Sequence, residues 1–154
     1  MLFRSRLLND AQRFDNVLDL GCGTAVLAMS AARMGAASVL ASDIDPVAVE
    51  VALANVQANG LEGRVGCVES IGFDSPVVQA GAPFDLIFAN ILKGPLIELA
   101  PDMAAHLASG GLAILSGLLI EQADEIVEVY QALGFDLQTR EDLGEWSALT
   151  LRWR

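Results

Sequence analysis

The chain has 154 residues, of which 53% are apolar, and its 20 acidic and 9 basic residues give a formal net charge of −11. This length and apolar content suit one folded domain with its own core and exclude an intrinsically disordered protein. Because the arginines are scattered and Lys93 is the single lysine, the sequence offers no basic stripe for phosphates. We therefore expect no nucleic-acid partner.

Apolar runs of strand length alternate with helical patterns along the chain. This alternation predicts an α/β fold with a doubly wound, Rossmann-like sheet of seven strands, mostly parallel. The short connection "EDLGEW" between the last two runs predicts an antiparallel carboxyl-terminal pair. The predicted strands cover residues 16–20, 38–42, 64–68, 84–89, 111–116, 135–140 and 147–153.

Two predicted helices have clear boundary signals. The first begins after Asp45, a good N-cap, with Pro46 at the first helical position, and it ends at the Asn59-Gly60 pair. In the second, apolar residues recur at three- and four-residue spacing over residues 120–133 and stop before a glycine. That spacing predicts a helix with one face on the core.

No repeat, low-complexity tract or linker divides the chain. Residues 1–14 carry apolar side chains at roughly helical spacing, which predicts an amino-terminal helix or the remnant of a longer segment, ahead of a single domain over residues 15–154. Cys22 and Cys67 lack metal-ligand spacing, so we expect reduced thiols, no metal site and a cytoplasmic location. No apolar run is long enough to span a membrane, so we expect no membrane partner.

The segment "VLDLGCGTAVLA" joins a strand, a glycine turn and a helical pattern, as in sites for nucleotide-like ligands. Val26 occupies the place of the last glycine of a dinucleotide fingerprint, and the Gly-Lys-Ser/Thr ending of a phosphate loop is absent. What remains is Asp19 followed by Gly21 and Gly23. A carboxylate at this place would repel a pyrophosphate and attract a cation, and S-adenosylmethionine carries both an ammonium and a sulfonium. We predict that these three residues bind S-adenosylmethionine.

A second acidic residue, Asp43, ends the next predicted strand, 24 positions after Asp19. In α/β nucleoside sites, a carboxylate at this place accepts hydrogen bonds from the ribose hydroxyls. The alternative for Asp43 is an Asx turn or a helix cap, although Asp45 already suits the cap. We also assign Ile44 to the cofactor site, and Glu69 and Ser70, just after the third strand, are placed to meet the adenine amine.

The fourth predicted strand ends in a polar residue within "FDLIFANILKGPL". Asn90 follows a buried run at the carboxyl end of that strand, where such sheets bind ligands. We predict that Asn90 is catalytic, with its carbonyl accepting from an amine nucleophile and aiming the nitrogen at the sulfonium methyl group, and that it also borders the cofactor. The alternative is that Asn90 only ties down the loop that follows.

Five stretches resemble the catalytic domain of the ribosomal protein L11 methyltransferases, class I S-adenosylmethionine-dependent enzymes, and the resemblance covers about residues 15 to 154. Most related amino-methylating enzymes have Asn-Pro-Pro-aromatic where this chain has Asn90-Ile91-Leu92. The combination of "DIDP" and "ANILKGPL" therefore distinguishes this family from those enzymes. The stretches are "VLDLGCGTAVLAMSAARMGA", "ASDIDPVAVEVALANVQANG", "FDLIFANILKGPLIELAP", "LSGLLIEQADEIVEVYQALGF" and "EWSALTLRW".

The resemblance implies methylation of lysine and N-terminal amino groups on a large-subunit ribosomal protein, a basic partner that suits an acidic enzyme. It implies Asp19, Gly21 and Gly23 around the methionine part of the cofactor, Asp43 on the ribose and Asn90 near the amine. We expect a monomer.

Two departures from the family pattern stand out. Ala25 replaces a usual glycine, and a recognition domain followed by a Gly-Thr-Gly-x-His-x-Thr-Thr segment does not precede residue 15. We therefore expect a truncated member. Two other functions stay open: a methyltransferase for another protein or a small amine, and a domain that binds S-adenosylmethionine without catalysis.

Overall fold

The structure is a computed structural model that describes residues 12–154. The helix predicted over residues 1–14 falls mostly outside this range, and residues 12–14 form neither helix nor strand. No helix in the described part of the chain is both long enough and apolar enough to cross a membrane.

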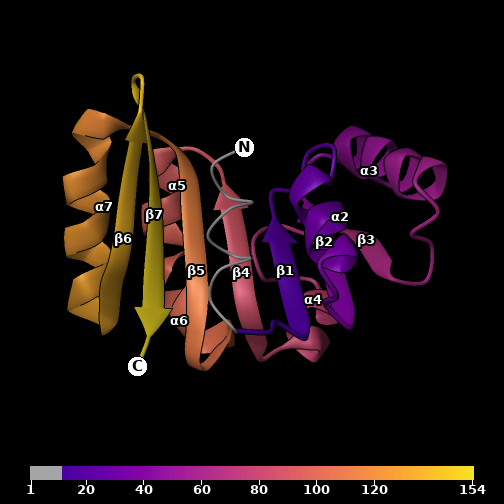
Figure 1. The fold of residues 1–154 in the computed structure, drawn as a ribbon, viewed down its shortest axis with the longest axis horizontal. Coiled ribbons are helices and arrows are strands. Elements are labelled where there is room, and N and C mark those ends of the chain that lie inside the picture. The colour runs from indigo at the N-terminus through magenta and orange to yellow at the C-terminus, as the bar shows by residue number, and fades with distance from the viewer. Residues whose placement is uncertain (1–11) are drawn as a thin grey trace.

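Seven strands form one sheet in the order β3-β2-β1-β4-β5-β7-β6 (Figure 1). The first five strands pair in parallel, whereas β7 runs antiparallel to both β5 and β6. The predicted fold class and the antiparallel carboxyl-terminal pair are confirmed. The strands are β1 (Asn16–Leu20), β2 (Ser38–Asp43), β3 (Val65–Glu69), β4 (Phe84–Asn90), β5 (Leu107–Leu119), β6 (Phe135–Leu143) and β7 (Trp146–Trp153).

The two helices with clear boundary signals are confirmed. Asp45 accepts a hydrogen bond from the Val47 amide at 2.9 Å at the start of α3, and Gly134 ends α7 with φ 108°. The three short helices between β3 and β5 have at most seven residues each, too few for a visible period, and were not predicted. The helices are α2 (Val26–Arg33), α3 (Pro46–Ala58), α4 (Pro76–Gly81), α5 (Lys93–Glu98), α6 (Ala100–His106) and α7 (Ile120–Leu133).

Helices cover both faces of the sheet, so the core has two parts. Alternate residues of a strand point to opposite faces. Val17 of β1 and Ile114 of β5 therefore pack in the cluster that includes α2 and α3, whereas Leu18 and Leu115 pack in the cluster that includes α4 to α7. Figure 1 shows α2 and α3 in front of the sheet and α5 and α6 behind it. Burial on both faces explains why the central strands are continuous apolar runs.

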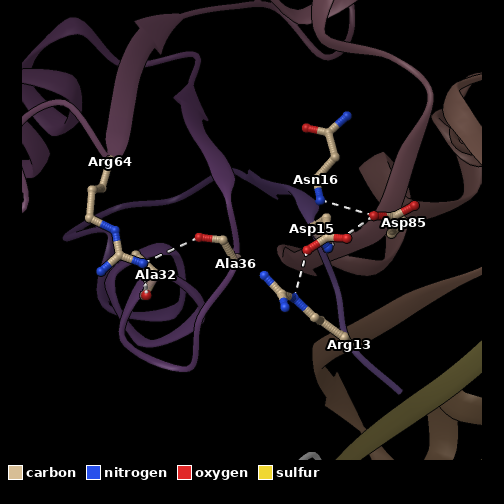
Figure 2. Close-up of polar contacts among 7 residues, drawn as sticks. All are labelled: Arg13, Asp15, Asn16, Ala32, Ala36, Arg64 and Asp85. Carbon is tan, nitrogen blue, oxygen red and sulfur yellow. Dashed lines mark hydrogen bonds and ion pairs between the residues drawn. The ribbon is translucent and has the colours of Figure 1, made fainter. Parts of the chain in front are cut away.

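The amino ends of β1 and β4 are joined through one carboxylate (Figure 2). One oxygen of Asp85 accepts hydrogen bonds from the amides of Asp15 and Asn16, at 3.0 and 2.9 Å. On another part of the same figure, the Arg64 guanidinium donates to the carbonyls of Ala32 and Ala36, which lie at the end of α2 and just beyond it. These hydrogen bonds hold the amino end of β1 and the carboxyl end of α2. The loops that follow the carboxyl ends of the parallel strands lie at the other end of the strands.

Strand β5 is longer than predicted, covering Leu107–Leu119 rather than residues 111–116. The glycines in this segment are local signals for the end of a strand. The strand nevertheless continues, because it pairs with β4 on one side and with β7 on the other. The strand contains an irregularity between Leu115 and Leu118, where its pairing with β7 shifts by one residue. Such bulges bend a strand and redirect its side chains.

Candidate functional site

The predicted site residues meet at one edge of the sheet, where the parallel strands end. Asp43 pairs with Glu69, and Leu20 pairs with both Ser42 and Ala89. The chain therefore leaves β1 at Gly21, level with Asp43 on one side and with Asn90 at the end of β4 on the other. Ligands of open α/β sheets bind outside these ends, beside the strand where the order reverses, and here that strand is β1.

The loop after β1 has the backbone conformation that its glycines suggest. Gly21 and Gly23 have φ of 69° and 52°, a region that side chains disfavour. A Cβ at Gly23 would meet no atom within 4 Å, so the backbone there is open to a ligand. Ala25 also has positive φ, 62°, and its methyl group is fully buried in the core beneath α2. Burial of the methyl group, about 0.8 kcal/mol, offsets part of a backbone strain of about 1–2 kcal/mol.

Asp43 is half-buried, and both of its carboxylate oxygens accept backbone hydrogen bonds. Oδ2 accepts from the Gly23 amide at 2.9 Å, and Oδ1 accepts from the Asp45 amide at 3.0 Å. The second bond is the Asx turn considered from the sequence, and the first connects β2 to the glycine loop. Each carboxylate oxygen retains a further lone pair, so these bonds leave acceptor capacity for ligand hydroxyls.

Asp19 lies beneath the loop with 1% of its surface exposed. Its Oδ2 accepts a hydrogen bond from the Ala28 amide at 3.0 Å, in the first turn of α2. No side chain next to α2 caps that helix, so Asp19 supplies the missing acceptor from the neighbouring strand. Burial raises its pKa to about 6, the Ala28 bond acts against this, and the nearby Asp43 charge adds to it. The structure thus places Asp19 behind the loop, where its carboxylate holds the start of α2.

The acidic ends of β2 and β3 are each followed closely by an exposed apolar residue. Ile44 follows Asp43 and is 63% exposed, and Ile71 lies two residues after Glu69 and is 66% exposed. Glu69 is itself exposed and has no hydrogen-bond partner among the described residues. Ser70 is buried, and its hydroxyl is hydrogen-bonded to the backbone of the loop. Sequence reasoning missed Ile71, although an isoleucine in a loop just after an acidic strand end is a usable signal for an apolar ligand contact.

Asn90 lies at the end of β4 with its side chain exposed. Within residues 12–154 its carboxamide makes no hydrogen bond. The alternative role, a tie for the following loop, would require such a bond. The next residues form α5 rather than an extended loop, with its first-turn proline in a tolerated position.

The two cysteines are free, and Cys22 lies buried in the glycine loop. Burial, reinforced by the charges of Asp19 and Asp43, raises the pKa of the Cys22 thiol to about 12. Burial also raises the pKa of Cys67. Both thiols are therefore protonated and unreactive at neutral pH.

Comparisons with known proteins identify the family of the chain. The family model of the ribosomal protein L11 methyltransferase (PrmA) matches residues 5–154. The chain is 46% identical over 137 residues to the ribosomal protein L11 methyltransferase of Brucella suis, covering 89% of this chain and 48% of that protein. The chain spans about half the length of the curated relatives it matches.

Solved structures show the same fold. The ribosomal protein L11 methylase of Lactobacillus delbrueckii subsp. bulgaricus has a TM-score of 0.85 at 29% identity, covering 96% of this chain and 74% of that one. The putative methyltransferase SMU.776, solved in complex with SAH, has a TM-score of 0.80 at 18% identity. The match covers 98% of this chain and 48% of that one. The family-model match and the 46% identity to the Brucella suis protein show that the chain belongs to the ribosomal protein L11 methyltransferase family.

Proposed function

We propose that this member of the ribosomal protein L11 methyltransferase family transfers methyl groups from S-adenosylmethionine to lysine and N-terminal amino groups of a large-subunit ribosomal protein. The observation that carries the proposal is the exposed Asn90 carboxamide, free of hydrogen bonds within the described chain and level with the glycine loop. A domain that only bound the cofactor would have no need of this amide. The free thiols of Cys22 and Cys67 suit the cytoplasm, where ribosomes and reduced thiols occur together.

The residues at the strand ends fit the cofactor. Asp43 has lone pairs left for the two ribose hydroxyls, and Glu69 is free to accept from the adenine amine. Ile44 and Ile71 offer apolar contacts to the flat faces of the base. Gly23 has open space where a side chain would stand, which suits close approach of the methionine part. The negative charge of this edge favours the ammonium and sulfonium groups.

S-adenosylmethionine, when bound, supplies the methyl group: the amine lone pair forms the N–C bond while the C–S bond breaks, leaving its electrons on sulfur, and the methylated amine then releases a proton to water. Asn90 orients the nucleophile by accepting an N–H bond on its carbonyl oxygen. Lysine, with a reference pKa near 10.4, needs about 4.6 kcal/mol to lose its proton at pH 7. An apolar surrounding and a neighbouring sulfonium both lower that cost. Orientation and desolvation are therefore the main contributions expected of this site.

The test combines binding and mass spectrometry. The chain should bind S-adenosylmethionine or its demethylated product in calorimetry and should not bind nicotinamide dinucleotides. Incubation with S-adenosylmethionine and purified ribosomal protein L11 should add whole methyl groups to lysine or the N-terminal amine. Preference for a dinucleotide would overturn the cofactor assignment.

A second candidate function is cofactor binding without methyl transfer by this chain alone. It is favoured by one observation, that the chain covers only 48% of its curated relative from Brucella suis. The two functions separate when the part of a relative that this chain does not match is supplied by fusion. Transfer that appears only in the fusion assigns substrate binding to that part. Transfer by the chain itself removes the second candidate.

A further inference from the structure

Gly117 lies at the bulge of β5 and faces the side chain of Asn90. A Cβ built on Gly117 would lie 2.6 Å from the Asn90 carbonyl oxygen and 3.3 Å from the backbone oxygen of Ile91. Real Cβ atoms do not approach other atoms as closely as 2.6 Å. The Asn90 oxygen therefore occupies space that exists because residue 117 has no side chain.

The bulge explains how Gly117 reaches this place. Asn90 pairs with Ser116 across the parallel β4–β5 ladder. On the other side of β5, the pairing with β7 shifts by one residue between Leu115 and Leu118, and Gly117 has φ 78°. An extra residue with positive φ bends the strand locally. The bend brings the bare Cα of Gly117 against the Asn90 side chain.

A second glycine contacts the next residue from the opposite side. A Cβ on Gly21 would lie 2.4 Å from Cγ2 of Ile91, which packs against the core beneath α5 and α7. Ile91 is branched at Cβ, so its methyl group moves only if χ1 changes. The Asn90-Ile91 step thus lies between the glycine loop of β1 and the bulge of β5, with no room for a side chain on either neighbour.

We propose that Gly117 is a positioning residue for Asn90: its missing side chain leaves the space in which the Asn90 carbonyl oxygen is held toward the substrate amine. This inference rests on the proposed function, since Asn90 must act on an amine for its orientation to matter. The contact itself is independent of that function. A methyl group at residue 117 would displace the carboxamide, and a misplacement of about 1 Å costs up to a hundredfold in rate.

Gly110 provides a matched control on the same strand. Its φ is 77°, against 78° for Gly117, but a Cβ there would meet no atom within 4 Å. Gly110→Ala therefore introduces a side chain at a matching φ without touching Asn90. The difference between Gly117→Ala and Gly110→Ala isolates the effect of the contact.

The experiment is a double-mutant cycle on the whole chain with the variants Gly117→Ala, Gly110→Ala, Asn90→Ala and Gly117→Ala/Asn90→Ala. Three quantities are measured: the urea unfolding midpoint, the affinity for S-adenosylhomocysteine by calorimetry, and the single-turnover rate of methyl transfer to ribosomal protein L11 at saturating acceptor. We expect Gly117→Ala to lower the saturating rate roughly ten- to hundredfold with cofactor affinity within about twofold of wild type. Gly110→Ala should leave both near wild type. In the Asn90→Ala background, Gly117→Ala should cause no further loss of rate.

The outcomes separate the positioning role of Gly117 from the proposed methyl transfer. Equal rates for Gly117→Ala and Gly110→Ala would overturn the positioning role, as would an undiminished effect of Gly117→Ala when Asn90 is already alanine. Unfolding midpoints show where any strain lies: the Asn90 oxygen is the end of an exposed side chain that moves aside at little cost, so any excess loss of midpoint in Gly117→Ala over Gly110→Ala comes from the Ile91 backbone oxygen and should persist in the Asn90→Ala background. Absence of methyl transfer by wild type and by its fusion to the unmatched part of a relative would instead remove the proposed function, and the positioning role with it.

Discussion

The carboxylate of Asp43 at the end of β2 accepts a hydrogen bond from the backbone amide of Gly23, at 2.9 Å. The bond holds the glycine loop of β1 against the neighbouring strand. The same side chain also accepts from the Asp45 amide at the entrance to α3. One acidic residue therefore orders two loops at the edge of the sheet and still has acceptor positions for a ligand.

Replacing Asp43 with alanine should weaken S-adenosylmethionine binding by about 1.5–3 kcal/mol, the range for hydrogen bonds to charged groups. The loss combines the proposed ribose contact with the bond that holds Gly23. Calorimetry on the folded variant measures it. Asp45→Ala is the control, because Asp45 caps α3 through Val47 alone. That change should lower stability by about 0.5–2 kcal/mol and leave the cofactor affinity unchanged. Equal affinities for wild type and Asp43→Ala would restrict Asp43 to its turn.

Asn90→Ala should abolish most methyl transfer without destabilising the chain. The side chain is exposed and unbonded within the described residues, so its removal takes away no intramolecular hydrogen bond. We expect the unfolding free energy to change by less than about 0.5 kcal/mol. Cofactor affinity should stay nearly intact, because the proposed bond is to the amine. The single-turnover rate should fall by roughly a hundredfold. A normal rate in this variant would remove Asn90 from the active site.

The buried carboxyl of Asp19 should make stability depend on pH in an unusual direction. Burial raises its pKa from 3.8 to about 6, so between about pH 4 and pH 6 the folded chain binds more protons than the unfolded chain. The Asp19 contribution to the unfolding free energy therefore falls as the pH rises through this window and is constant above it.

Asp19→Asn keeps an acceptor for the Ala28 amide and removes the titration. Urea unfolding of both proteins at pH 4.5 and pH 7.5 tests the expectation. The variant should gain stability relative to wild type between these two pH values, by roughly 2 kcal/mol. A stability difference that stayed constant with pH would mean that Asp19 titrates alike in the folded and unfolded chain.

Asp85→Ala should destabilise the fold while leaving the site intact. The Asp85 carboxylate holds the amides of Asp15 and Asn16 where β1 begins, at the edge opposite the glycine loop (Figure 2). Removing it leaves two backbone donors without this partner, at a cost of about 1–3 kcal/mol. A denaturant melt should show this loss. Calorimetry at a temperature where the variant is folded should give wild-type cofactor affinity. A large loss of affinity would show that this end of β1 is coupled to the site.

Local signals in the sequence were sufficient for much of the fold. Apolar runs predicted all seven strands, and the signal was clearest for the central ones, because a strand buried on both faces is apolar along its length. The cap at Asp45 and the glycine after Leu133 set the limits of α3 and α7, because capping depends on neighbours within four residues. The short helices and the full length of β5 were missed, since pairing with β4 and β7 outweighed the local effect of glycine.

The sequence by itself determined which residue types end each strand: Asp19, Gly21 and Gly23 around the first loop, Asp43 after the second and Asn90 after the fourth. Only the tertiary structure decided what each one contacts. It placed Asp19 under α2, joined Asp43 to Gly23, and set Gly117 against Asn90. The physical reason is that motifs act over a few neighbouring residues, whereas these contacts join residues 9 to 27 positions apart through strand register and a bulge.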